Sequence, residues 1–317
     1  MYWNADKKHR WAVVLAGGEG ARLHELTRRI AGEAKPKQFC RFLEGKTLLT
    51  HTRERIAPLF DEERVLFVLT RSHERFYREQ LAGVDDRRKV IQPMNRGTAV
   101  AMALSLELIA RQDDEALVAF FPCDHHFSNC SAFRNCVEYG LGTMDQYPES
   151  LLVLGAEARY PEVEYGWIEP GRALTDSPDH PLRRVKRFWE KPSLQQAQIL
   201  RRLGCMWNTF VTIGLAGAFM EVLAATIPEV TQPLASCLTN GELERFYDET
   251  ASVDFSKSVL SRLPGRLMVL RDTKSGWMDL GNPDRVLEAV AHSGIEPPWF
   301  AAVRNGAAAA LPVSVFN

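Results

Sequence analysis

Short apolar runs alternate with segments of helical period along the first half of the chain. Runs rich in branched and aromatic residues predict strands at Trp11–Ala16, Val65–Leu69, Lys89–Gln92, Leu117–Phe121 and Leu151–Gly155. Between these strands, the spacing of apolar residues predicts helices at Leu48–Pro58, Ser72–Leu81, Thr98–Arg111 and Ala132–Tyr147. Uninterrupted apolar strands separated by helices are typical of a parallel sheet that is covered on both faces. We therefore expect the first half to be a doubly wound α/β unit.

The second half has a less regular pattern. Strands are expected at Tyr165–Glu169, Val185–Trp189, Asn208–Ile213 and Arg266–Leu270, with a loop rich in proline and aspartate at Pro170–Pro181. Helices are expected at Leu194–Leu203, Gly217–Thr226, Asp254–Leu263 and Pro283–His292. The pattern therefore indicates one domain over residues 1–293 that contains an inserted β region. Residues 294–317 are rich in proline and alanine, and we expect this C-terminal tail to be loosely ordered.

Composition and charge narrow the class of protein. The chain has 317 residues, of which 45% are hydrophobic and 25% charged, as in ordinary globular proteins. Its formal net charge of -1 provides no field that would attract nucleic acid or an anionic membrane. The first apolar run, Trp11–Ala16, is too short for a signal peptide or a membrane span. The six cysteines form no Cys-x-x-Cys pair. We therefore expect a reduced, cytoplasmic protein without a nucleic-acid or membrane partner.

A glycine-rich segment, residues 15–23 with the sequence LAGGEGARL, directly follows the first predicted strand. Glycines let the backbone turn sharply and bring its N–H groups against a phosphate chain. In an open parallel sheet, ligands bind at the carboxyl ends of the strands, where this loop lies. Arg22 adds a forked cation for phosphate oxygens. The candidate nucleotide-binding residues of the loop are Leu15, Ala16, Gly17, Gly18 and Gly20. A plain turn is the alternative interpretation.

A dinucleotide-binding fingerprint is the rival interpretation of this loop. Gly18 and Gly20 match its first two glycines, but Leu23 stands at the third glycine position. About 20 residues further on, where the fingerprint has an acidic residue for the ribose, the chain reads KPKQ over residues 35–38. Basic residues suit phosphate better than a neutral ribose. The alternative of a nicotinamide-dependent oxidoreductase is therefore disfavoured. Binding of NAD to the protein would support that alternative.

Taken together, the motifs resemble the sugar-1-phosphate nucleotidyltransferase family, and specifically its mannose-1-phosphate guanylyltransferase branch. After the glycine-rich loop, the similar segments follow in the order of the family at Lys35–Phe39, Gln92–Ala99, Phe121–His126, Tyr165–Glu169, Glu190–Pro192, Trp207–Asn208 and Gly276–Gly281. The resemblance runs from residue 12 to about residue 290. It implies a Rossmann-like, mostly parallel sheet with an NTP-binding half at about 11–155 and a sugar-phosphate-binding half at about 156–293.

The resemblance also implies a reaction, in which a sugar phosphate oxygen attacks the α-phosphorus of an NTP and pyrophosphate leaves. Mg²⁺ would be the cofactor, with Asp124 and Asp279 as its ligands. For Asp124, a helix or turn cap is the alternative. Arg22 and Lys37 would hold the NTP phosphates, although a solvated turn is the alternative for Lys37. Lys191 would hold the sugar phosphate, and Pro192 after it favours an extended backbone at that position.

The remaining candidate residues fall into two groups. Nucleotide binding is expected from Gln92, Asn95, Gly97 and Thr98, where a simple helix N-cap is the alternative for Asn95. Sugar binding is expected from Asp124, Tyr165, Gly166, Glu169, Glu190 and Asn208. His125 and His126 point to opposite sides of an extended chain, and we expect them to support the site without binding substrate.

Two departures from the branch leave the substrates open. Thr209-Phe210 follows Trp207-Asn208 where the branch usually has a small residue and then glycine, and Asn282-Pro283 follows Gly281. GTP and mannose 1-phosphate are the expected substrates. A uridylyl- or thymidylyltransferase that acts on glucose 1-phosphate, and a non-catalytic sensor of nucleotide sugars, are the alternatives. A homodimer is compatible with the sequence, which does not fix the oligomeric state.

Overall fold

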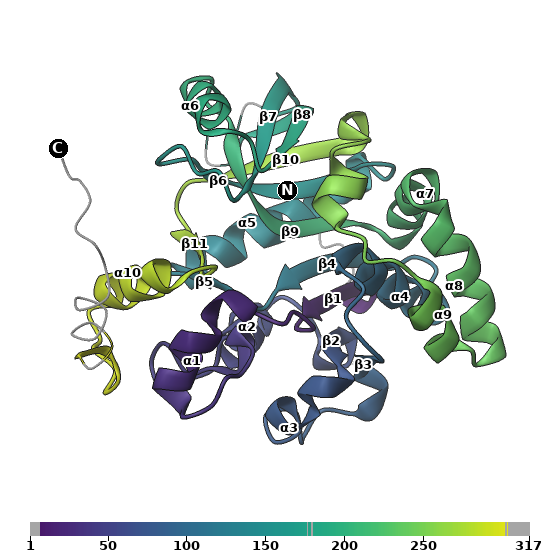
Figure 1. The fold of residues 1–317 in the computed structure, drawn as a ribbon. Coiled ribbons are helices and arrows are strands. Elements are labelled where there is room, and N and C mark those ends of the chain that lie inside the picture. Colours follow the sequence, from purple (N-terminus) through teal and green to yellow (C-terminus); the bar gives the residue numbers. More distant parts are fainter. Residues whose placement is uncertain (1–6, 176, 179, 302, 304–317) are drawn as a thin grey trace.

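Strands from both halves of the chain form one continuous sheet in the computed structural model, which describes residues 7–175, 177–178, 180–301 and 303. Its strand order is β3-β2-β1-β4-β9-β6-β10-β8-β7 (Figure 1). The strands span β1 Arg10–Leu15, β2 Val65–Thr70, β3 Lys89–Gln92, β4 Leu117–Pro122, β6 Leu151–Glu157, β7 Gly166–Ala173, β8 Leu182–Glu190, β9 Met206–Leu215 and β10 Leu267–Asp272. Each strand predicted from the apolar runs is present.

The two ends of the sheet differ in strand direction. Strands β3, β2, β1 and β4 are parallel to one another, as the first half of the sequence predicts. Strand β9 runs antiparallel to both β4 and β6, and β8 runs antiparallel to both β10 and β7. Strand β7 also pairs with β9, with Trp167 opposite Trp207. This last pairing closes β9, β6, β10, β8 and β7 into a small barrel, which is the predicted inserted β region.

Helices cover both faces of the sheet, which confirms the predicted α/β class. One face carries α2 Leu48–Ile56, α3 Glu74–Tyr77, α5 Cys130–Thr143 and α6 Leu194–Arg202. The other carries α4 Thr98–Ala110, α7 Ala216–Thr226, α8 Pro228–Asn240 and α9 Leu243–Glu249. Side chains alternate along β1, so that Ala12 and Val14 pack on the first face and Trp11 and Val13 on the second. In the described part of the chain, no helix has the length and apolar character needed to cross a membrane.

A smaller third core lies beside the glycine-rich loop. It contains side chains of α1 His24–Ala31 and α10 Pro283–Ser293, and Met278 packs against it from β11 Trp277–Asp279. Strand β11 pairs with β5 His125–Phe127 in a separate two-stranded sheet. Phe300 and Val303 are buried in this core together with Phe42. Part of the expected tail therefore packs against this core, where the ring of Trp299 lies 6.4 Å from that of Phe42. Residues 302 and 304–317 of that tail lie outside the described residues.

Several predicted element bounds are corrected by the structure. The loop predicted at Pro170–Pro181 begins later, because β7 continues to Ala173 past an irregular register at Pro170. Proline is tolerated at such an irregularity because it has no N–H to contribute to the ladder. The helix predicted at Asp254–Leu263 is only a short π-helical turn, Ser256–Leu260. Helices α1, α8 and α9 were not predicted.

Candidate active site

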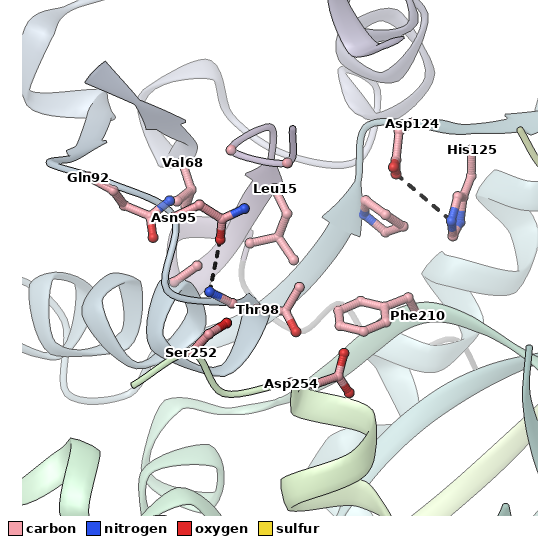
Figure 2. Close-up of a pocket in the computed structure, with 15 residues that line it drawn as sticks. Leu15, Val68, Gln92, Asn95, Thr98, Asp124, His125, Phe210, Ser252 and Asp254 are labelled. Carbon is pink, nitrogen blue, oxygen red and sulfur yellow. Dashed lines mark hydrogen bonds and ion pairs between the residues drawn. The ribbon is translucent and has the colours of Figure 1, made fainter. Parts of the chain in front are cut away.

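A cavity of about 310 Å³ opens at the carboxyl ends of the parallel strands, between the two halves of the chain (Figure 2). Eight predicted site residues line it together, namely Leu15, Gly17, Gly18, Gln92, Asn95, Gly97, Thr98 and Asp124. Its wall also includes residues that the sequence did not assign to binding, namely Val68, Ala101, Pro122, His125, Phe210, Ser252 and Asp254. The cavity is therefore built from three predicted motifs, from neighbouring residues of the first half, and from Phe210, Ser252 and Asp254 of the second half.

The glycine-rich loop is held in place by side chains from two other segments. Buried Gln38 donates from Nε2 to the carbonyl oxygens of Ala16 at 2.9 Å and Gly18 at 2.7 Å. Thr70 Oγ1 donates to the carbonyl oxygen of Gly17 at 2.9 Å. These bonds occupy carbonyl groups on the inner side of the loop and fix its path. The motif at residues 35–39 therefore shapes the loop through Gln38, a role that the sequence analysis did not assign.

The start of helix α4 forms one end of the cavity. Gly97 has φ 84°, and a Cβ at this position would collide with the carbonyl oxygen of Val253, so only glycine fits. Asn95 Oδ1 accepts the Gly97 N–H at 2.8 Å, while Gly97 itself is the N-cap residue. The positive end of the α4 dipole faces the cavity and favours a negatively charged or electron-rich ligand.

Two other predicted nucleotide-binding residues, Gln92 and Thr98, connect the α4 end of the cavity to the second half of the chain. The Gln92 Oε1 atom accepts a hydrogen bond from the Tyr247 hydroxyl at 3.1 Å. Thr98 Oγ1 accepts the backbone N–H of Phe255 at 3.0 Å. Both contacts fasten the segment that carries Ser252 and Asp254 against the N-terminus of α4. This docking explains how residues distant in the sequence come to line the cavity.

Lys37 lies between the two predicted metal ligands. Its ammonium is 3.1 Å from Asp124 Oδ2 and 3.4 Å from Asp279 Oδ1, and it donates to the carbonyl oxygen of Leu280 at 3.1 Å. Burial alone would lower the pKa of Lys37, but the two carboxylates outweigh burial and raise that pKa. Desolvation would raise the pKa of the partly exposed Asp124, but the charge of Lys37 outweighs it and holds that pKa below its usual value. Lys37 is only 7% exposed, which excludes the solvated turn.

The two carboxylates also meet His125. Its Nε2 atom lies 3.8 Å from Asp124 Oδ1 and 3.7 Å from Asp279 Oδ1, and Trp277 Nε1 donates to its Nδ1. Among the described residues, no group of three or more His, Cys, Asp or Glu side chains has the arrangement of a metal site. Two converging carboxylates nevertheless fit Mg²⁺, which binds few protein ligands and takes the rest from water and phosphate.

Asp279 is anchored from behind by a buried arginine of α10. Arg285 donates from Nη1 to Asp279 Oδ2 at 3.2 Å and from Nη2 to Glu162 Oε2 at 2.5 Å. Its guanidinium also stacks over the ring of Tyr165 at 4.5 Å. Asn282 caps α10 and Pro283 occupies its first turn, so the unusual pair after Gly281 starts the helix that carries Arg285.

The predicted sugar-binding residues are placed differently from one another. Tyr165 is buried in an aromatic cluster, with ring centroids 5.3 Å from Trp207 and 5.2 Å from Trp277. Glu169 accepts hydrogen bonds from Lys186 at 2.7 Å and from Trp189 at 3.4 Å, so its carboxylate is occupied within the barrel. Neither residue lines the cavity, so their predicted contact with the sugar stays a prediction.

Gly166 and Glu190 lie side by side at the ends of β7 and β8. A Cβ at Gly166 would come within 2.9 Å of Glu190 Oε2, so glycine leaves room for this carboxyl group. Glu190 Oε2 is buried and makes no hydrogen bond. Burial first, and then the nearby carboxylate of Asp254, raises the pKa of Glu190 to about 7. A buried carboxyl oxygen without a partner is a group to which a hydroxyl of a ligand can donate.

Two predicted cationic contacts differ from expectation in geometry. Lys191 has φ 46° and is not extended, because its N–H donates to the carbonyl oxygen of Tyr165 and turns the chain at the end of the β7–β8 ladder. This left-handed conformation is disfavoured for lysine and concentrates at functional sites. Arg22 is exposed and forms an ion pair with Glu164 at 3.0 Å.

The fold and this cavity agree with a known family. The family described as nucleotidyl transferase matches residues 11–294, and the chain belongs to it. This result confirms the resemblance noted from the sequence motifs.

Curated relatives narrow the comparison. The chain is 30% identical over 225 residues to a mannose-1-phosphate guanylyltransferase of Klebsiella pneumoniae, covering 69% of this chain and 46% of that protein. It is 28% identical over 298 residues to a mannose-1-phosphate guanylyltransferase of Salmonella typhimurium, covering 89% of this chain and 60% of that protein. The chain thus spans about half the length of the curated relatives it matches. A crystal structure named as a mannose-1-phosphate geranyltransferase from Thermus thermophilus has a TM-score of 0.76 at 28% identity, over 92% of this chain and 80% of that one.

Proposed function

We propose that this protein is a Mg²⁺-dependent guanylyltransferase that joins GMP from GTP to mannose 1-phosphate, forming GDP-mannose and pyrophosphate. The observation that carries the proposal is the position of Lys37 between Asp124 and Asp279 at the edge of the cavity. These groups combine a buried cation with two carboxylates beside a loop suited to phosphate. The named activity of the relatives supports the choice of GTP and mannose 1-phosphate.

The reaction brings two anions together, so positioning and charge neutralisation dominate catalysis. A sugar phosphate oxygen forms a bond to the α-phosphorus of GTP, and the bond from that phosphorus to the oxygen of the leaving pyrophosphate breaks. Gly17 and Gly18 would approach the triphosphate, while the N-terminus of α4 at Gly97 would face the base or ribose. Mg²⁺, held by Asp124 and Asp279, would supply charge neutralisation at the phosphates.

The chain's own cations would divide the phosphates between them. Lys37, fixed between its carboxylates, would face the α-phosphate, and Arg22 would leave Glu164 to contact the leaving pyrophosphate. Lys191 would hold the sugar phosphate. Glu190, beside Gly166, would accept a sugar hydroxyl with its unpartnered Oε2. Asn208 would act indirectly, since its Oδ1 accepts the N–H of Phe210.

Pyrophosphate release with Mg²⁺ across a grid of four NTPs and several sugar 1-phosphates tests the proposal. A signal confined to GTP and mannose 1-phosphate is the expected result. A signal with a different pair, such as UTP or dTTP with glucose 1-phosphate, would retain the mechanism and replace the substrates. Folded protein that binds nucleotide but releases no pyrophosphate with any pair would favour the non-catalytic sensor.

A further inference from the structure

Phe210 adopts a backbone conformation that a residue with a Cβ rarely takes. Its φ is 66°, in the left-handed region that favours glycine. Two hydrogen bonds hold it there, because its N–H donates to Asn208 Oδ1 at 3.0 Å and its carbonyl oxygen accepts from Thr212 Oγ1 at 3.1 Å. Asn208 is itself fixed by a bond from Nδ2 to Ser256 Oγ at 3.4 Å. The surrounding structure therefore enforces this conformation.

The strained turn directs the aromatic ring into the cavity. Phe210 lines the cavity, and Figure 2 shows its ring between Thr98 and Asp254 on one side and His125 on the other. The ring of fully buried Phe255 supports it from behind, with centroids 5.9 Å apart. A ring that is supported by the core and held by a fixed backbone cannot move aside easily. Phe210 is thus a rigid part of the cavity wall.

The Phe210 backbone belongs to the part of the site that carries the predicted sugar-binding residues. Phe210 comes from β9, in the half of the chain that also carries Gly166 and Glu190. Its N–H is held at 3.0 Å by Asn208, one of the predicted sugar-binding residues. The cavity of about 310 Å³ is at the lower end of the usual range of about 300–1,000 Å³ for ligand sites, and in the proposed reaction it also receives the nucleotide, so little room is left beside the ring. A phenyl ring therefore occupies space that a bulkier substrate would need.

We propose that Phe210 determines sugar specificity by limiting the bulk of the sugar 1-phosphate, so that an unsubstituted hexose 1-phosphate fits and an N-acetylated hexosamine 1-phosphate is excluded. This inference rests on the proposed function, since it assumes that the cavity receives a sugar 1-phosphate. The residue acts by steric exclusion and takes no part in bond making. Its removal changes which sugar is used and leaves the choice of nucleotide unchanged.

The substitutions Phe210→Gly and Phe210→Ala test the size limit, with Phe210→Leu as a control that keeps most of the side-chain volume. Each protein is assayed with GTP and either mannose 1-phosphate or N-acetylmannosamine 1-phosphate, which differ only in the substituent at C2. In Phe210→Gly and Phe210→Ala, the ratio of kcat/KM for the acetylated over the unsubstituted sugar is expected to rise at least tenfold. Phe210→Leu is expected to stay close to the wild-type ratio. An unchanged ratio in the glycine and alanine variants, or a changed preference among NTPs, would overturn the proposal.

Comparing Phe210→Gly with Phe210→Ala separates the effect of backbone strain at this position from the effect of side-chain size. Both variants open the cavity, but alanine retains a Cβ at φ 66° and glycine does not. Phe210→Gly is therefore expected to melt at a higher temperature than Phe210→Ala. Calorimetric binding of the two sugar 1-phosphates to each variant gives the ratio of their affinities, which tests the size limit without turnover. If wild type binds mannose 1-phosphate but no protein turns it over, the proposed reaction fails. If binding of the acetylated sugar is equally weak in wild type and in both small variants, the size limit fails.

Discussion

The ammonium of Lys37 lies 3.1 Å from the carboxylate of Asp124, and this contact joins the segment after the glycine-rich loop to the turn after β4. Asp279, from near the end of the chain, contacts the same ammonium at 3.4 Å. One buried cation thus brings together three segments that are far apart in the sequence. Lys37 thus compensates the repulsion between the two carboxylates that are proposed to hold Mg²⁺.

Replacement of Lys37 by alanine is expected to lower kcat/KM by about 10²–10³, the usual effect of removing one preorganised electrostatic contact. It should also destabilise the fold by about 3–5 kcal/mol, because the two carboxylates lose the cation that they share. Pyrophosphate release and urea unfolding measure the two effects. Lys35→Ala is the matched control, since Lys35 pairs only with Glu33 among the ion pairs found in the described residues. Equal effects of the two substitutions would contradict the assigned role.

Asp124→Ala and Lys191→Ala are each expected to abolish most turnover while the folded structure is retained. The first substitution would remove a proposed Mg²⁺ ligand, and the second would remove the cation proposed to hold the sugar phosphate. The melting temperature and the circular dichroism spectrum check that the fold is retained. Lys186→Ala serves as the control for Lys191, because the ammonium of Lys186 is already bound to Glu169 in the barrel. Wild-type rates in both the Asp124 and Lys191 variants would rule out this assignment.

The ion pair between Arg285 and Glu162 is expected to be strongly coupled. Their side chains are 7% and 11% exposed, so removing either partner leaves a buried charge. Arg285→Gln or Glu162→Gln alone should cost about 3–5 kcal/mol, and the double variant less than the sum of the two. Urea unfolding of all four proteins gives the coupling energy. Additive effects would show that the two side chains do not depend on each other. Because Arg285 also holds Asp279, its substitution should in addition raise the Mg²⁺ concentration needed for half-maximal activity.

The core of the sheet could be predicted from the sequence because its signals are local. A short uninterrupted apolar run such as Leu117–Phe121 has the length of a buried strand and is too short for a typical helix, and the glycines after β1 identify the loop. The convergence of Asp124 and Asp279 was expected only through the resemblance to a family. Their bond to Lys37 is a tertiary contact for which no local pattern exists.

Other site residues depend on packing between distant segments. Asp254 reaches the cavity because Val253 docks on Gly97, and neither residue indicates this contact locally. His125 was expected to support the site, yet it lines the cavity. The extended backbone predicted at Lys191 is wrong, because the ladder bond to Tyr165 outweighs the preference that Pro192 imposes. For Arg285, Asn282-Pro283 gave a helix-start signal that could have placed the residue in the first turn of α10.

Glu190 should make stability depend on pH in a direction opposite to that of an ordinary acidic residue. Its pKa is raised from 4.5 to about 7 in the folded protein. Between these two values, the folded state binds more protons at this site than the unfolded state does, so stability falls as pH rises and levels off above about pH 7. Glu190→Gln removes the ionisation. The melting temperature of the variant relative to wild type is therefore expected to increase from pH 5 to pH 8.

Glu169→Gln is the matched control for this pH dependence. The hydrogen bond from Lys186 holds the pKa of Glu169 below its usual value, so the stability that Glu169 contributes is lost only as pH falls through the acidic range. The difference in melting temperature between Glu169→Gln and wild type should thus be nearly constant from pH 6 to pH 8. A constant difference for Glu190→Gln over pH 5–8 would contradict the raised pKa. In that case the unpartnered Oε2 would be charged in the free protein, and a sugar hydroxyl would bind a carboxylate at every pH in this range.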